Sequence, residues 1–206
     1  RRLGTHADGV FDTMIVGPAA KVLINEGYLS KYKIVVPPGD YEKHLVKANE
    51  GSDFTREAMA VASRESCIVG DVVKNYLKFC KNKLTIVFAT DIESAFKLEK
   101  EFIDNDIPAK TLTGETPDQE RSQGIIDFEE ERTKVLINVD LFDEGLDIPG
   151  VECVIMARPT MSVSKYLQCI GRGLRVKKGK EFTLIIEHVG NIKRHGLPDQ
   201  HRTWTL

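Results

Sequence analysis

The stretch Val135-Leu136-Ile137-Asn138-Val139 leads directly into Asp140-Leu141-Phe142-Asp143-Glu144-Gly145-Leu146-Asp147-Ile148-Pro149. The first five residues are mostly apolar and β-branched, which is typical of a strand that is buried on both faces in a parallel sheet. In open α/β sheets, ligands bind beyond the carboxyl ends of such strands. The acidic segment with its glycine lies at that place, so the sequence predicts a ligand-contacting loop at Gly145 to Asp147.

Apolar runs alternate with helical segments on both sides of this stretch. Strands are expected at 33–36, 84–89, 135–139, 153–157 and 182–187, and helices at 18–26, about 54–62 and about 68–80. The charged, poorly patterned residues 39–53 are expected to form a loop or a frayed helix. Strands that alternate with helices predict an α/β fold with a parallel sheet covered on both faces.

Two further helices are predicted from their start signals. Thr90 with Glu93 resembles a capping box, and Thr116 is followed by a proline at the first helical position and by Gln119 three residues on. The first of these helices is expected to place one apolar face on the core, formed by Ile92, Ala95, Phe96, Phe102 and Ile103.

Composition indicates one globular domain. The chain has 206 residues, of which 41% are hydrophobic and 29% charged, and its formal net charge is −2. No apolar run reaches the ~18 residues that cross a bilayer, so no membrane is expected and a reducing cytoplasm is the default localisation. Cys153 is expected in the core and Cys169 partly exposed. The cysteines and histidines lack ligand spacing, so no metal site is expected.

The stretch Gln168-Cys169-Ile170-Gly171-Arg172-Gly173-Leu174-Arg175 sets two arginines three residues apart. A guanidinium is always charged and offers a rigid fork of donors that fits phosphate oxygens two at a time. In phosphoryl transfer, such a residue stabilises charge on the transferred group and can come from another domain. Alone, the spacing is also typical of a solvated surface helix with local salt bridges.

Four blocks in order resemble the second RecA-like domain of superfamily 2 helicases of the DEAD/DEAH type, bacterial or prophage-like. These blocks correspond to that family's motifs IV, IVa, V and VI: Ile86 to Thr90, Thr113-Gly114, Glu144 to Asp147, and Gln168 to Arg175. The resemblance implies a RecA-like parallel sheet in a three-layer sandwich. It also implies that residues 1–206 form a single helicase C-terminal domain, with 1–50 as a lead-in segment and the N-terminal ATPase domain absent.

The resemblance implies roles for the residues that match these motifs. Arg172 and Arg175 would reach across a cleft to an ATP bound mainly by another domain, with Gln168 on the same phosphate network. Gly145 would let the backbone approach the nucleotide, and Asp147 would contact its ribose or orient the arginines. The plain alternative for the last two residues is a loop glycine and a helix-capping aspartate.

A second group of residues is expected to contact DNA or RNA. Ala89, Thr90, Thr113 and Gly114 follow predicted strands, where N–H groups and hydroxyls can hold backbone phosphates. A simple turn is the alternative for Thr113-Gly114. The family often has a threonine in motif V that touches the strand, whereas Val139 stands here and cannot donate a hydrogen bond.

The chain lacks the Gly-x-x-x-x-Gly-Lys-Ser/Thr loop that cradles the β- and γ-phosphates. The resemblance therefore implies that ATP and Mg²⁺ are held mainly by the missing N-terminal RecA-like domain, and that this segment alone does not hydrolyse ATP. Two alternatives stay open. One is a degenerate helicase half that binds nucleic acid without taking part in ATP turnover, and the other is an unrelated doubly wound α/β protein.

Overall fold

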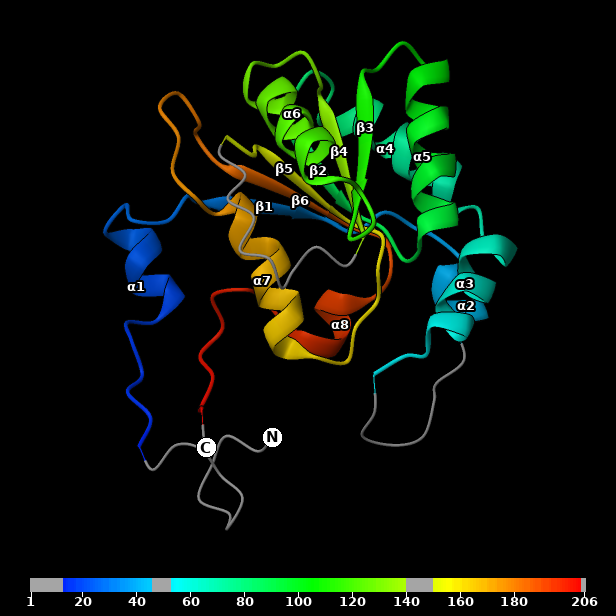
Figure 1. Cartoon of the computed structure of the whole chain (residues 1–206). Helices are drawn as coiled ribbons and strands as arrows, with labels where there is room; N and C mark the ends of the chain where they lie inside the picture. The colour runs from blue at the N-terminus through cyan, green and yellow to red at the C-terminus, as the bar shows by residue number, and fades with distance from the viewer. Residues whose placement is uncertain (1–12, 46–52, 140–149, 205–206) are drawn as a thin grey trace.

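The computed structural model describes residues 13–45, 53–139 and 150–204, and Figure 1 shows a single sheet flanked by helices. Its six strands all run parallel, in the order β1-β6-β5-β2-β4-β3. The strands are β1 (Tyr32–Val35), β2 (Thr85–Phe88), β3 (Ala109–Thr113), β4 (Val135–Val139), β5 (Cys153–Met156) and β6 (Thr183–Glu187). All five strands given by range from the sequence are therefore present, within one residue at each end.

Eight helices lie in the described residues. They are α1 (Ala20–Asn25), α2 (Tyr41–His44), α3 (Arg56–Glu65), α4 (Ile68–Phe79), α5 (Ile92–Asp104), α6 (Asp118–Glu129), α7 (Val163–Gly173) and α8 (Asn191–His195). None of them is long and apolar enough to cross a membrane.

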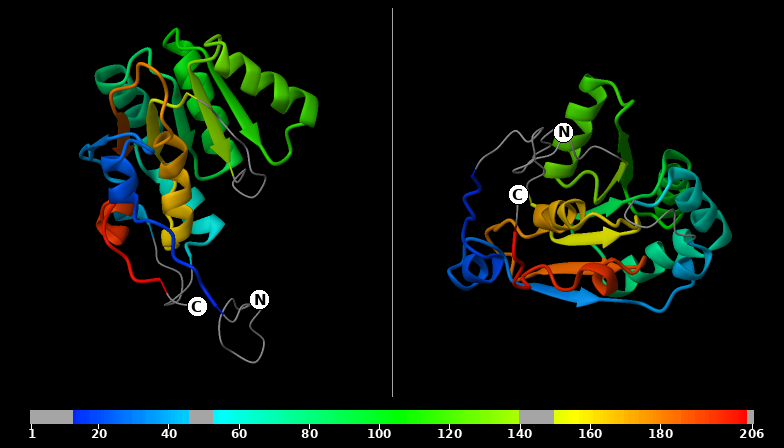
Figure 2. Two further views of the ribbon diagram at one scale, coloured as in Figure 1. Left: turned by 90° about the vertical axis from the view of Figure 1, so that its left-hand side faces the viewer. Right: turned by 90° about the horizontal axis from the view of Figure 1, so that it is seen from below.

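The sheet separates two apolar clusters, and strand β4 contributes to both. Val135, Ile137 and Val139 pack with helices α4 and α5, whereas Leu136 between them packs with α6 and α7. This division follows from the pleat, which points successive side chains to opposite faces. The result is the three-layer, RecA-like α/β sandwich that the sequence predicts, visible edge-on in Figure 2.

The chirality of the connections explains which helix covers which face. The connections β1 to β2 and β2 to β3 cross the sheet in one direction, and their helices α4 and α5 share one face. The connections β3 to β4 and β5 to β6 cross in the other direction, and α6 and α7 share the opposite face. Right-handed crossovers require this arrangement.

The expected start of α5 is wrong by one residue. Asp91 is the N-cap and forms the capping box with Ser94, whose N–H donates to Asp91 Oδ1 at 2.8 Å. Thr90 precedes the cap, and its hydroxyl donates to the Ala157 carbonyl at 3.0 Å. The buried face of α5 therefore differs from the expected one. Ala95 and Phe102 are buried with Ser94 and Leu98, while Phe96 and Ile103 are 55% and 51% exposed.

Two smaller expectations are also corrected. Pro117, rather than Thr116, is the N-cap of α6, because the Thr116 hydroxyl accepts from the Thr113 N–H at 2.9 Å. Cys169 is buried at the contact of α7 with the sheet instead of being partly exposed, while Cys153 is in the core as expected. Burial raises the pKa of the Cys169 thiol to about 12, so it stays protonated at neutral pH.

The last turn of α7 lies directly on strands β5 and β6. A Cβ atom at Gly173 would meet Val154 Cγ2 at 2.5 Å and Thr183 Cγ2 at 2.8 Å. The Gly173 carbonyl accepts from the Thr183 hydroxyl at 2.6 Å and from Lys180 Nζ at 2.7 Å. Only a residue without a side chain allows this approach, which fixes the distance between α7 and the sheet.

Strand β6 ends in a buried polar pair, Glu187 and His188, which are 1% and 9% exposed. Glu187 accepts from the N–H groups of Val189 at 2.9 Å and Ile192 at 3.5 Å, although burial still raises its pKa. Burial lowers the pKa of His188 to about 4, from an ordinary value of 6.5. The folded protein therefore holds His188 neutral.

We expect Gly173→Ala to destabilise the protein by about 1–3 kcal/mol, because the added methyl group overpacks the contact of α7 with β5 and β6. Gly171→Ala is the matched control, since a Cβ there meets nothing within 4 Å and alanine favours the helix. Urea unfolding of both variants measures the difference. Equal unfolding free energies for the two variants would contradict this account.

We expect His188 to make stability fall with acidification. Between its unfolded pKa of 6.5 and its folded pKa of about 4, only the unfolded chain takes up the proton. The stability is thus fully present above pH 6.5 and is lost as pH falls toward 4, by at most about 3 kcal/mol. Unfolding free energies at several pH values should decline less steeply for His188→Gln, and His201→Gln, at an exposed position, should follow the wild type. Since Glu187 is present in every variant, parallel curves for His188→Gln and wild type would refute the assignment.

Candidate functional site

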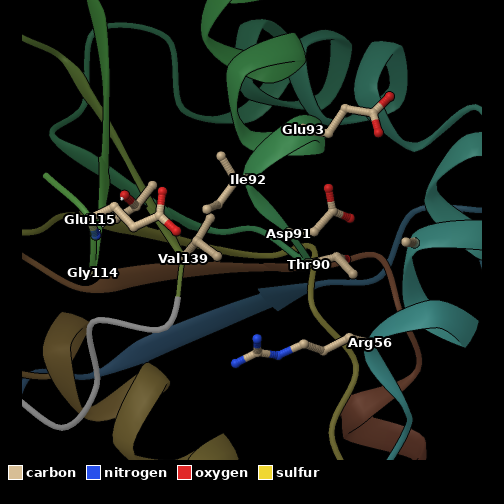
Figure 3. A pocket seen from close by; sticks show the side chains of 10 residues that line it. Arg56, Thr90, Asp91, Ile92, Glu93, Gly114, Glu115 and Val139 are labelled. Atoms are coloured by element: carbon tan, nitrogen blue, oxygen red, sulfur yellow. Dashed lines mark hydrogen bonds between the residues drawn. The ribbon is translucent and has the colours of Figure 1, made fainter.

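A pocket of about 480 Å³ opens at the carboxyl ends of β2, β3 and β4. Figure 3 shows its side chains converging from these strand ends and from α3 and α5. Ten residues line it: Arg56, Ala60, Thr90, Asp91, Ile92, Glu93, Thr113, Gly114, Glu115 and Val139. Parallel strands end at the same edge of the sheet. Three of the residues expected to contact nucleic acid therefore lie together at this pocket, with Val139 of the same motif set beside them.

The threonine hydroxyls at this pocket are engaged within the protein. Thr90 Oγ1 donates to the Ala157 carbonyl at 3.0 Å, and Thr113 Oγ1 accepts from the Glu115 N–H at 3.2 Å. Gly114 differs, because a Cβ placed there would meet nothing within 4 Å, so its backbone borders open space. Ala89 is not among the lining residues: it is 1% exposed, and its N–H donates to the Asn138 carbonyl at 2.9 Å.

The charged side chains that line the pocket differ in sign and in their partners within the protein. Asp91 caps α5, and Glu93 pairs with Lys97 at 2.7 Å and Arg64 at 3.8 Å. The hydrogen bond and charge of Lys97 lower the pKa of Glu93, which is therefore ionised at neutral pH. Among the lining residues, Arg56 is the one with a positive charge. An anionic group entering the pocket would meet that guanidinium as its cationic contact.

The expected arginines lie on and just beyond α7, on the other face of the sheet from α4 and α5. Gln168 is exposed and Arg172 half-buried, and their four-residue spacing places them on one side of the helix. Arg175 is exposed after the helix end, where Ser30 N–H donates to the Leu174 carbonyl at 2.7 Å. The structure thus brings the two arginines to one end of α7, apart from the pocket lining.

Sequence reasoning missed a polar network that joins the segment before α3 to the loop before α7. Asp53 Oδ1 accepts from the Met161 N–H at 2.7 Å, and its Oδ2 from the Thr160 hydroxyl at 3.0 Å. On the other side, the Thr160 N–H donates to Asn191 Oδ1 at 3.0 Å. Asp53 belongs to the segment that had no recognisable pattern, so no local signal pointed to it.

Gly145 and Asp147, expected at the nucleotide, lie outside the described residues. In the part of the chain that the structure covers, no group of three His, Cys, Asp or Glu side chains is placed to hold a metal ion. The described geometry therefore presents two features with a possible ligand chemistry: the pocket with Arg56 and Gly114, and the helix end with Arg172 and Arg175.

Comparison with known proteins agrees with the fold and with the family that the sequence resembles. The family described as the helicase conserved C-terminal domain matches residues 70–177. A 51.5 kDa protein of a Lactococcus phage is 35% identical over 99% of this chain and 44% of its own length. IRC3 of Saccharomyces cerevisiae, whose name describes an ATP-dependent helicase, is 37% identical over 88% of this chain and 27% of its own length.

A solved structure supports the same assignment. The C-terminal domain of the DEAD-box protein Dbp5 is 27% identical, with a TM-score of 0.51 over 60% of this chain and 71% of that domain. The chain thus spans less than half the length of the two relatives named above. On the match over residues 70–177 and the six-stranded parallel sheet, the chain belongs to the helicase conserved C-terminal domain family, as the second RecA-like domain of a superfamily 2 helicase.

Proposed function

We propose that this domain supplies arginines to an ATP site shared with an N-terminal RecA-like domain, as half of a helicase or translocase acting on DNA or RNA. The observation that carries the proposal is the pair Arg172 and Arg175 at one end of α7, half-buried and exposed respectively. The close packing of Gly173 holds that helix end rigidly against the sheet. A rigidly presented guanidinium is what stabilisation of a transferring phosphoryl group requires.

ATP and Mg²⁺ would be held mainly by the N-terminal domain, because this chain lacks a phosphate-binding loop. Closure of the two domains on ATP brings Arg172 and Arg175 to the γ-phosphate, with Gln168 as a polar contact. There the guanidinium groups neutralise charge that develops during attack by water. Gly145 and Asp147 would meet the nucleotide at the same cleft.

Nucleic acid would bind at the pocket beyond β2, β3 and β4. The open backbone at Gly114 supports this location, because N–H groups at strand ends can hold backbone phosphates. Thr90 and Ala89 would shape the site from within, since the Thr90 hydroxyl and the Ala89 N–H already donate to protein carbonyls. The Thr113 hydroxyl accepts from the Glu115 N–H and would donate its proton to a phosphate oxygen. Opening and closing of the domains would then move the strand, as a two-state motion biased by ATP.

Val139 favours a second candidate function. It lines the pocket and is 5% exposed, where the family often has a threonine that touches the strand. A domain that holds nucleic acid without taking part in ATP turnover would fit this substitution. Salt-dependent strand binding by a full-length protein that shows no ATP hydrolysis would select this alternative.

We expect Arg172→Ala and Arg175→Ala each to lower strand-stimulated ATP hydrolysis by the full-length protein about 10³-fold or more, the range for arginines that stabilise phosphoryl transfer. Steady-state kcat with single-stranded DNA and RNA measures the loss. Lys178→Ala, an exposed basic residue close to the same helix end, is the matched control and should keep kcat. Undiminished turnover in both arginine variants would mean that the arginine assignment is wrong, even if the protein is a motor.

A further inference from the structure

Arg56 contributes a positive charge to the pocket from outside residues 70–177, the part of the chain that the family match covers. It is the first residue of α3, and the family match begins only at residue 70. Its side chain is exposed, and Figure 3 shows the guanidinium reaching from α3 into the space beside Thr90 and Val139. Ala60, one helical turn further, lines the same wall and leaves room for an approaching group.

The backbone that carries Arg56 is anchored by its three preceding residues. Asp53 holds the Met161 N–H, the Thr160 hydroxyl and, at 3.5 Å, the ammonium of Lys165. Phe54 is 7% exposed, and the Thr55 hydroxyl caps α3 by accepting from the Ala58 N–H at 3.1 Å. The start of α3 is therefore fixed, and the position of the Arg56 Cα relative to the pocket is fixed with it.

Asp53 stays ionised in this anchor. Burial alone raises the pKa of its carboxyl, but the Met161 and Phe54 N–H groups, the Thr160 hydroxyl and Lys165 together lower it below the ordinary value. Its negative charge is thus neutralised by the loop before α7.

Arg56 gives the pocket one group suited to a phosphodiester, in a lining that also holds Asp91, Glu93 and Glu115. A guanidinium presents two parallel donors that match two phosphate oxygens, and it remains charged at any physiological pH. The open backbone at Gly114 borders the same pocket and is a second group that such an oxygen could approach. The two flank a pocket of about 480 Å³.

We propose that Arg56 binds a backbone phosphate of the nucleic-acid strand at this pocket, an anchored contact contributed by the start of α3. The inference rests on the proposed function, because it deepens the strand site described there. The contact is a charge-assisted hydrogen bond to a phosphate and involves no base. DNA and RNA strands of any sequence can therefore make it.

The test is strand binding by the full-length protein, measured by fluorescence anisotropy at several salt concentrations. The probes are labelled oligodeoxythymidylate and oligouridylate. We expect Arg56→Ala to weaken binding about 10-fold, as for a charged hydrogen bond. The slope of log K against log salt should become shallower by about 0.7, the value for one phosphate contact of a single strand. Arg56→Lys should keep the slope, because it keeps the charge, while losing part of the affinity with the two-donor fork.

Two further variants separate this inference from the function on which it rests. Lys74→Ala, an exposed basic residue on α4 outside the pocket lining, is the control and should leave affinity and slope unchanged. Gly114→Asp adds a negative charge to the pocket and should weaken binding whatever Arg56 does. If Gly114→Asp weakens binding and Arg56→Ala changes neither quantity, the Arg56 assignment is overturned alone. If neither variant has an effect, the strand site itself is misplaced.

Discussion

All six strands of the sheet run in the same direction, and this constraint places the pocket and the polar loops of the domain at one edge. A parallel sheet covered on both faces offers its strands no polar surroundings along their length, so polar groups gather where the strands end. The pocket lies beyond β2, β3 and β4. The loop that contains Thr160 follows β5, and Glu187 and His188 lie at the end of β6. One edge of the sheet therefore carries the strand pocket and the start of the arginine-bearing helix.

Two contacts then set the helices that project from this edge. Gly173 lets the end of α7 lie directly on β5 and β6, and Asp53 ties the beginning of α7 to the beginning of α3. Each contact is specific in a different way: the first excludes any side chain, and the second requires a carboxylate with two accepting oxygens. Together they hold Arg172 and Arg56 on elements whose ends are fixed, which is what a site for charged phosphates needs.

The sequence predicted the features that depend on local pattern. The run from Val135 to Val139 indicated a buried strand, and the expectation that ligands bind beyond strand ends pointed to Thr113 and Gly114. The role of Thr90 was not predicted, because its hydroxyl contacts Ala157, 67 residues further along the chain. Asp53 was missed for the same reason, since its partner Met161 is 108 residues away. Contacts between residues so far apart in the sequence cannot be recognised from a short run of neighbouring residues.

The pairing of β1 with β6 has a consequence for how the chain is made. Tyr32 to Val35 are synthesised well before Thr183 to Ile186, which are their strand partner within the described residues. Until then Ile34 has no neighbour on the sheet, and the free side of β5 is open as well. Such long-range parallel pairing forms slowly and leaves strand edges exposed. A chain halted before β6 therefore presents two unpaired edges, so chaperone demand should be greatest just before synthesis of that strand.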